Sequence, residues 1–188
     1  MQLSTEKINA MLHELSVNNS QEALKSLYLY YYSKLNTFLS YYVRDHQVIQ
    51  EIISDSFLAI WEQKNRLSGI YNFNAYIYGV ARNRAVSHLR KELAKSKDVE
   101  IETVSPYLQG SSDPESVLIT EELTVLLNKT IETLPAKSKL VFKLIREENL
   151  KYKDAAEVLD VSVKTIEAHM TLAVKRLREA LSKEINND

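Results

Sequence analysis

The sequence predicts an all-α protein made of two small helical bundles joined by a flexible linker. Its 188 residues include only 3 Gly and 3 Pro, and 45% of them are hydrophobic, which is typical of helical proteins. Apolar residues return at helical spacing through most of the chain. That pattern stops in residues 96–115, an acidic stretch with two prolines and a glycine. We expect this stretch to be the linker between a domain of residues 1–95 and a domain of residues 116–188.

The composition excludes several classes of site. Cysteine is absent, which excludes disulfides and thiolate metal sites, and no two of the four histidines have helical ligand spacing. The sequence contains no glycine-rich phosphate loop and no nucleophile with a spaced base, so we expect no enzyme and no cofactor, metal or small-molecule substrate. It has no apolar run long enough to cross a bilayer and no signal-peptide pattern, which predicts a cytoplasmic protein.

The charges are segregated along the chain, although the formal net charge is only −1. Residues 1–95 carry eleven basic and eight acidic side chains, residues 96–115 carry one and five, and residues 116–188 carry twelve of each. Around the end of the first part, six basic residues face the single acid Glu92: Arg82, Arg84, Arg90, Lys91, Lys95 and Lys97. A local cluster of this kind can bind phosphate even on a neutral protein.

Four helices are expected in the first domain. Their ranges are 8–15, 21 to about 43, 45–63, and 72 or 74 to about 97. Ser20 is a candidate cap for the second, which also holds six of the eleven tyrosines. We interpret these tyrosines as core side chains with their hydroxyls at the edge. The third helix has an inner face of Val48, Ile52, Ile53, Ser56, Phe57, Ile60 and Trp61, and an acidic outer face of Gln50, Glu51, Ser54, Asp55 and Glu62.

Aromatic residues at the start of the fourth helix precede its basic cluster. Phe73, Tyr76 and Tyr78 come first, and the arginines follow. Unpaired bases stack on aromatic faces while Arg and Lys follow the backbone, so this order suits single-stranded or opening DNA. An aromatic core followed by a solvated basic face explains the same residues, and the residues alone leave both interpretations open.

The second domain is predicted to be a bundle of four helices. The first begins at Asp113 and Pro114, and Leu134-Pro135 ends it. A second helix covers residues 136–148, and residues 149–182 then read as a helix-turn-helix. Its first helix covers residues 151–159, the turn lies at Asp160-Val161, and Ser162 caps the next helix. That helix has a buried stripe of Ile166, Met170, Ala173, Leu177 and Leu181.

The other side of this last helix has the properties of a DNA-recognition helix. It carries Lys164, Glu167, Ala168, Thr171 and Lys175, which are short or polar side chains near the start and a cation further along. Short and polar side chains reach base edges in the major groove, and flanking cations meet phosphates. The alternative is an ordinary solvated face of an amphipathic helix.

Taken together, these motifs resemble the extracytoplasmic-function (ECF) sigma factors of bacterial RNA polymerase over nearly the whole chain. Residues 51–61 (EIISDSFLAIW) resemble the family's polymerase-binding helix, and residues 73–85 (FNAYIYGVARNRA) resemble the segment that opens and reads the minus-10 element. The matching stretches of the sigma-four region are LP at 134–135, KLVF at 139–142, YKDAA at 152–156, SVKTI at 162–166 and AVKRLR at 173–178. Departures from the family's usual residues occur at Ser54, Tyr76, Ser87, Lys151 and Asp160.

The resemblance implies three sets of functional residues. The minus-35 set is Ser162, Lys164, Thr165, Glu167, Ala168, His169, Thr171, Lys175 and Arg176, with Ser162, His169, Lys175 and Arg176 nearer the phosphates. The minus-10 set is Asn72, Phe73, Asn74, Tyr76, Tyr78, Arg82, Asn83, Arg84 and Arg90. The polymerase-binding set is Glu51, Ser54, Asp55, Phe57 and Trp61, of which Phe57 and Trp61 are also candidates for the core.

The resemblance also implies the function and the partners. A transcription initiation factor of this kind binds core RNA polymerase at the coiled coil of its largest subunit and at its flap region, and binds promoter DNA. The family usually has an anti-sigma factor, often membrane-anchored. Two other classes remain open: a LuxR-type helix-turn-helix regulator that acts without polymerase, and a helical adaptor that binds only proteins.

Overall fold

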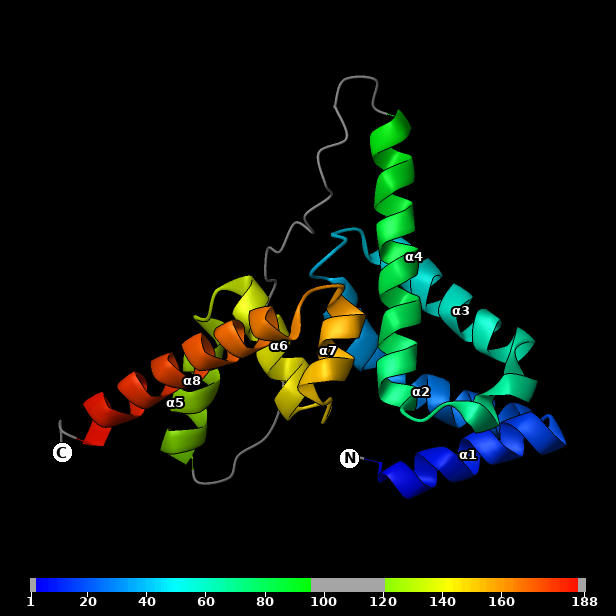
Figure 1. Cartoon of the computed structure of the whole chain (residues 1–188), viewed down its shortest axis with the longest axis horizontal. Helices are drawn as coiled ribbons and strands as arrows, with labels where there is room; N and C mark the ends of the chain where they lie inside the picture. The colour runs from blue at the N-terminus through cyan, green and yellow to red at the C-terminus, as the bar shows by residue number, and fades with distance from the viewer. Residues whose placement is uncertain (1–2, 96–120, 186–188) are drawn as a thin grey trace. The chain divides into compact units, whose positions relative to one another are not determined.

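The computed structural model of the protein describes residues 3–95 and 121–185 (Figure 1). In these ranges the chain forms eight α-helices and one 3₁₀ helix, and it forms no strand there. The all-α prediction is therefore confirmed. The chain divides into two compact units, Met1–Tyr107 and Leu108–Asp188. The linker expected at residues 96–115, and the helix start expected at Asp113 and Pro114, lie outside the described residues.

The first unit contains four α-helices and the 3₁₀ helix (Figure 1). Their bounds are α1 Thr5–Asn18, α2 Gln21–Leu39, α3 His46–Glu62, η1 Lys64–Gly69 and α4 Phe73–Lys95. α1 is longer than predicted in both directions. α2 ends at Leu39 and not near residue 43, because the chain turns there: the amides of Tyr42 and Val43 both donate to the Leu39 carbonyl. The sequence predicted a break where η1 forms, but not a 3₁₀ helix.

Side-chain caps fix where the helices of this unit begin. Ser20 Oγ accepts from the amide three residues later at 3.2 Å, which confirms the predicted cap of α2. Asp45 caps α3 by accepting from the amide two residues later at 2.8 Å. Asn72 Oδ1 accepts from the amide three residues later at 3.2 Å, at the start of α4. Each cap satisfies an amide that has no partner inside its own helix.

The core of the first unit lies between α2, α3 and α4, while α1 packs against α2 and η1. Burial of its apolar side chains is the main stabilising contribution. The largest fully buried ones are Leu15, Leu27, Tyr31, Leu35, Leu39, Ile49, Ile53, Ile60, Leu67, Ile77 and Tyr78. Tyr31 supports the interpretation of the α2 tyrosines as core side chains, because its ring is buried and its hydroxyl donates to Asn74 Oδ1.

The second unit contains α5 Glu121–Glu132, α6 Ala136–Arg146, α7 Tyr152–Leu159 and α8 Val163–Ile185. α8 packs against the other three helices. Its neighbours contribute Leu140, Val141, Leu144, Ala155, Ala156 and Val158 to the core. The break predicted at Leu134-Pro135 is confirmed, since α6 begins directly after Pro135. Lys139 is buried here, and its Nζ lies 2.8 Å from Glu132 Oε2.

The helix-turn-helix consists of α7, a short turn and α8. Asp160 adopts the left-handed conformation with φ 55°, and the Val161 amide donates to the Ala156 carbonyl at 3.0 Å. Ser162 Oγ accepts from the Thr165 amide at 3.1 Å, at the first turn of α8. Both the predicted turn and the predicted cap are confirmed. A left-handed residue followed at once by a helix cap reverses the chain sharply, and this sets the angle between α7 and α8.

Candidate nucleic-acid interface

α8 presents a buried side and an exposed polar side. Ile166, Met170 and Ala173 are buried, as the predicted stripe requires, whereas Leu177 and Leu181 are half-buried. The exposed side, called the reading face here, consists of Lys164, Glu167, Ala168 and Thr171, and Lys175 is exposed one turn further along. The predicted two-faced helix is confirmed. Side chains of these kinds can reach base edges in the major groove.

Two predicted minus-35 residues belong to the cap at the start of α8. Ser162 Oγ lies 2.8 Å from Thr165 Oγ1 and also accepts from the Thr165 amide. Ser162 is exposed and Thr165 is half-buried. The cap holds both hydroxyls at the end of the helix where backbone amides point outward, which is a favourable place for a phosphate.

Two other predicted minus-35 residues are bonded to the start of α6 and to the segment just before it. His169 Nδ1 lies 3.1 Å from the Ser138 hydroxyl, and Arg176 Nη1 donates to the Thr133 carbonyl at 3.3 Å. These residues lie seven apart on α8, so they are on one side of it, and we call this side the braced flank (His169 and Arg176). Burial, and then the charge of Lys137, hold the pKa of His169 below its usual value. His169 is therefore neutral at neutral pH.

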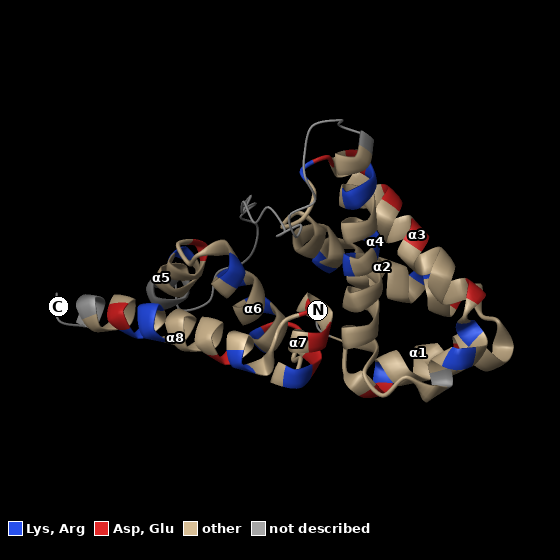
Figure 2. Cartoon of the chain, turned by 45° about the horizontal axis from the view of Figure 1, so that its top comes forward, with Lys and Arg blue, Asp and Glu red and all other residues tan. Residues whose placement is uncertain are grey.

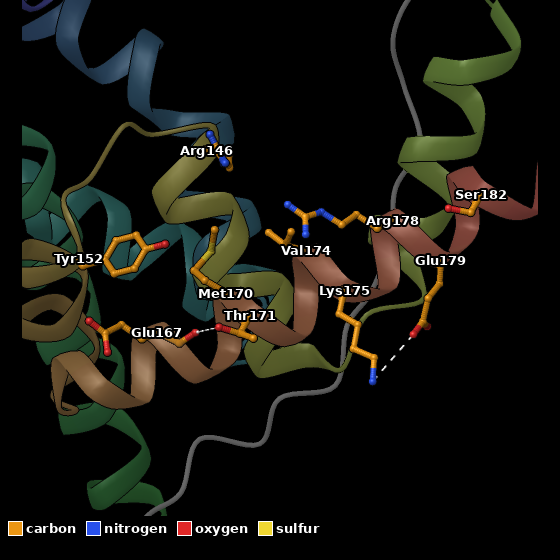
Figure 3. Close-up of a pocket in the computed structure, with 10 residues that line it drawn as sticks. All are labelled: Arg146, Tyr152, Glu167, Met170, Thr171, Val174, Lys175, Arg178, Glu179 and Ser182. Carbon is orange, nitrogen blue, oxygen red and sulfur yellow. Dashed lines mark hydrogen bonds and ion pairs between the residues drawn. The ribbon is translucent and has the colours of Figure 1, made fainter. Parts of the chain in front are cut away.

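A groove of about 860 Å³ lies along α8 (Figure 3). Arg146 reaches it from the end of α6 and Tyr152 from the start of α7. The α8 side chains that line it are Glu167, Met170, Thr171, Val174, Lys175, Arg178, Glu179 and Ser182. Sequence reasoning left Arg146, Tyr152 and Arg178 out of the interface. The positive charge of Arg146 just before the helix-turn-helix was the signal that could have identified it.

One hydrogen bond and one ion pair join residues of this groove, and both are drawn in Figure 3. Thr171 Oγ1 donates to the Glu167 carbonyl at 2.8 Å. Lys175 Nζ lies 3.9 Å from Glu179 Oε1, and both side chains are mostly exposed. A pair this long and this exposed contributes little, so Lys175 can exchange its carboxylate for a phosphate.

The first unit buries two of the aromatic residues that the sequence assigned to base stacking. Phe73 is 4% exposed and Tyr78 is 2% exposed. Their rings pack against α2: the Tyr31–Phe73 centroids are 5.6 Å apart and the Phe38–Tyr78 centroids 4.9 Å. These two assignments are corrected, because a ring with no exposed face cannot stack on a base. Tyr76 is half-buried, with its hydroxyl 3.5 Å from Gln63 Oε1.

The remaining minus-10 candidates differ in exposure. Asn83 and Arg90 are exposed, while Asn72, Asn74, Arg82 and Arg84 are half-buried. Arg82 hydrogen-bonds the buried Tyr42 hydroxyl. Burial raises the pKa of Tyr42 to about 12, although Arg82 acts in the opposite direction. Asn72 and Asn74 make the cap and the Tyr31 bond described above, so three of these side chains hold the unit together.

α3 carries an exposed acidic side next to α4, and Figure 2 shows acidic residues along α3 and basic residues toward the end of α4. Glu51, Ser54 and Asp55 are exposed, and Asp55 Oδ2 lies 3.3 Å from Arg84 Nη1. Leu58, which the sequence did not single out, is 55% exposed on the same helix.

The two aromatic residues of the predicted polymerase-binding set are not fully available. Phe57 is buried and packs edge-on against Tyr28, with centroids 5.1 Å apart, so its assignment to the polymerase-binding surface is corrected to the core. Trp61 is half-buried, and Lys64 Nζ lies 4.4 Å from its ring centroid.

Other kinds of site find no support in the described ranges. Residues 3–95 and 121–185 contain no group of three or more His, Cys, Asp or Glu side chains that could hold a metal ion. No helix within those ranges has the length and apolar character needed to cross a membrane.

Each unit matches a different region of one protein family. The family model for sigma-70 region 2 matches residues 27–94, and the model for sigma-70 region 4 matches residues 124–177. Over 190 residues, and 97% of each chain, the protein is 25% identical to the ECF RNA polymerase sigma-E factor of Salmonella typhimurium. It is also 25% identical over 188 residues to the RNA polymerase sigma-H factor of Pseudomonas aeruginosa, covering 96% of this chain and 95% of that one.

Two solved structures share the fold. One is CnrH in complex with the cytosolic domain of CnrY, with TM-score 0.53, 17% identity, and coverage of 94% of this chain and 98% of that one. The other is the sigma factor RpoE in complex with the anti-sigma factor NepR from Bartonella quintana, with TM-score 0.52, 24% identity, and coverage of 84% and 96%. The LuxR-type alternative gains no support, because both units match sigma-70 regions. The chain belongs to the sigma-70 family as an extracytoplasmic-function sigma factor, a non-enzymatic factor of transcription initiation.

Proposed function

We propose that this sigma factor binds core RNA polymerase and brings it to promoters by contacting the minus-10 element with its first unit and the minus-35 element with its second. One observation carries the proposal: two separate units match regions 2 and 4 of the same family, in the order that such a factor needs. Neither region alone would support contact with two promoter elements.

The second unit binds duplex DNA through α8. The reading face (Lys164, Glu167, Ala168 and Thr171) meets base edges in the major groove. Lys175 is assigned to phosphates, and Arg146 and Arg178 of the groove join it. Ser162 and Thr165 present the capped start of α8 to the backbone. The reading face therefore recognises the base sequence, and the cations bind the phosphate backbone.

The first unit holds the separated strands of the minus-10 element along α4. Asn83 and Arg90 are exposed, and Arg84 and Tyr76 are partly exposed, so an amide, two cations and one aromatic ring are within reach of unpaired DNA. The ring of Tyr76 stacks on a base while the arginines follow phosphates. Binding separated strands better than the duplex shifts the opening equilibrium without any chemical step by this protein.

α3 docks on the polymerase. Glu51, Ser54 and Asp55 give its exposed side an acidic character, and Leu58 adds an apolar contact in the same stretch. A patch with an apolar centre and charged neighbours is the usual composition of a protein interface. The partner surface is expected to be basic, and the polymerase coiled coil and flap region are the proposed contacts of the two units.

An anti-sigma factor is the third proposed partner. The two solved structures described above are complexes, and one of them names its partner as an anti-sigma factor. The proposed location is the cytoplasm, because core polymerase and promoter DNA are found there. Such a partner would inhibit by covering the surfaces that polymerase or DNA requires.

Run-off transcription with purified core polymerase and a library of genomic fragments tests the proposal. The full chain should create new start sites, and Glu51→Lys should abolish them because it reverses charge on the docking side of α3. Glu14→Lys is the matched control, since it changes an exposed glutamate of α1 in the same unit. If polymerase neither captures the wild-type chain nor starts at any new site, the proposed function is wrong.

A further inference from the structure

Ser138 is a buried serine in α6 to which the sequence assigned no role. It has no exposed surface, and its hydroxyl lies 3.1 Å from Nδ1 of His169 on α8. The two residues are 31 positions apart in the sequence, so this bond joins two helices. It fixes the orientation of an imidazole that would otherwise rotate about its side-chain torsions.

An imidazole held by one nitrogen presents the other nitrogen in a fixed direction. Ser138 occupies Nδ1, and the His169 ring remains half-exposed, so its outer edge carries Nε2. Burial and the neighbouring Lys137 keep this ring neutral at neutral pH. A neutral imidazole has two tautomers, and the one whose Nδ1 accepts from the Ser138 hydroxyl carries its single N–H at Nε2, where it can donate.

The place of His169 on α8 indicates what this N–H can meet. Both residues of the braced flank lie to one side of the reading face, where His169 is bonded to Ser138 of α6 and Arg176 to Thr133, between α5 and α6. When a recognition helix lies in the major groove, its reading face meets bases and the side chains beside that face meet the sugar-phosphate backbone. A phosphate oxygen is an acceptor that suits a neutral N–H donor.

We propose that Ser138 is a positioning residue for minus-35 binding: it holds His169 so that Nε2 donates a hydrogen bond to one backbone phosphate of the duplex. This inference rests on the proposed function of the second unit. It assigns His169 a directional, uncharged contact, in contrast to the charge-based contact of Lys175. It also gives the buried hydroxyl of Ser138 a role in DNA binding and not only in packing.

A phosphate-neutralisation scan tests the proposal with the full chain bound to core polymerase. Once run-off transcription has identified a promoter, its minus-35 duplex is made in versions that each carry one uncharged methylphosphonate linkage. Wild-type holoenzyme should lose about ten-fold in affinity at the linkage that His169 contacts. Ser138→Ala and His169→Asn should lose less than about two-fold at that linkage and should match the wild type at all others.

The combination of the two changes separates positioning from packing. Asn can keep a hydrogen bond to Ser138 but is too short to supply an atom where Nε2 lies. If Ser138 acts through His169, Ser138→Ala should lower promoter affinity in the wild-type background and have no further effect in the His169→Asn background. Ser56→Ala is the matched control, because Ser56 is an equally buried serine of the first unit that donates to the Ile52 carbonyl.

Three results would overturn the proposal. One is that Ser138→Ala holoenzyme loses as much affinity as the wild type at every methylphosphonate linkage. Another is an effect of Ser138→Ala that persists undiminished beside His169→Asn, since this would show action through general packing. The third is wild-type holoenzyme that initiates at no promoter, which refutes the proposed function together with this inference, whereas the first two refute the positioning role alone.

Discussion

Lys175 and Arg176 are sequence neighbours with the same charge, but the structure gives them different surroundings. Lys175 Nζ is 3.9 Å from the carboxylate of Glu179, and the two side chains are 72% and 56% exposed. Arg176 Nη1 donates to the Thr133 carbonyl at 3.3 Å and thereby ties α8 to the end of α5. We predict that Lys175→Ala changes only DNA binding, whereas Arg176→Ala also destabilises the second unit.

The size of each effect follows from these contacts. Loss of one phosphate contact lowers the slope of log affinity against log salt by about 0.9. Between 50 and 200 mM salt, the advantage of the wild type over Lys175→Ala should therefore shrink by about 3.5-fold. The Arg176 bond is exposed and contributes at the low end of the usual range, so its loss should lower the melting temperature of this small unit by about 2–5 °C.

Two measurements on the same variants check this prediction. Promoter affinity of the holoenzyme is measured at several salt concentrations, and thermal unfolding of the isolated full chain is followed by circular dichroism. Arg176→Lys serves as the control for charge, because it keeps the cation but cannot reproduce the guanidinium geometry. It should retain the wild-type salt slope and still unfold at a lower temperature.

Either of two results would refute this reasoning. If Lys175→Ala leaves the salt slope unchanged, its ammonium is not at a phosphate. If Arg176→Ala unfolds at the wild-type temperature, the bond to Thr133 does not hold α8 in solution. A change of base preference in either variant would place that side chain at a base edge.

Three further changes have defined outcomes. Ser20→Ala removes the cap of α2 and should lower the free energy of unfolding of the first unit by about 1 kcal/mol, measured by denaturation followed through the single tryptophan, Trp61; an unchanged midpoint would refute this. The folded pKa of His169 lies below its unfolded value of 6.5, so the unfolded chain binds the proton more tightly. The wild type should therefore lose stability relative to His169→Asn as the pH falls below 6.5, with a constant difference above it, and a flat difference throughout would contradict the lowered pKa. Glu167→Ala should change base preference at the minus-35 element by about five-fold or more while minus-10 preference stays, and an unaltered promoter profile would remove Glu167 from the reading face.

Local patterns in the sequence were sufficient for most helices and their ends. Ser20 and Ser162 act as the caps that their residue types favour, and Asp160 takes the left-handed conformation at the turn. These features depend on residues within one helical turn, so the sequence contains all the information needed. The end of α2 at Leu39 was not predictable in this way, because Tyr41, Tyr42 and Val43, which follow Ser40, are also buried in the core.

The sequence could not decide whether the aromatic residues of α4 face the core or the DNA. Phe73 stands four residues before Ile77 and eight before Ala81, and all three are buried. That spacing is a signal for the core that outweighs the neighbouring arginines. Arg84 could not be placed from the sequence at all, because its partner Asp55 lies 29 residues earlier on another helix.

The bonds around α8 divide the predicted minus-35 residues by physical role. Ser162 and Thr165 are held by the cap, His169 by Ser138 of α6, and Arg176 by the segment between α5 and α6. The side chains of the reading face are all exposed and differ from one another in charge and size. Side chains ordered before binding lose less conformational entropy when they meet the DNA. The held residues should therefore contribute affinity that is similar for every sequence, and base preference should come from the exposed ones. A factor built this way can change its promoter through the reading face while the bonds that orient α8 stay the same.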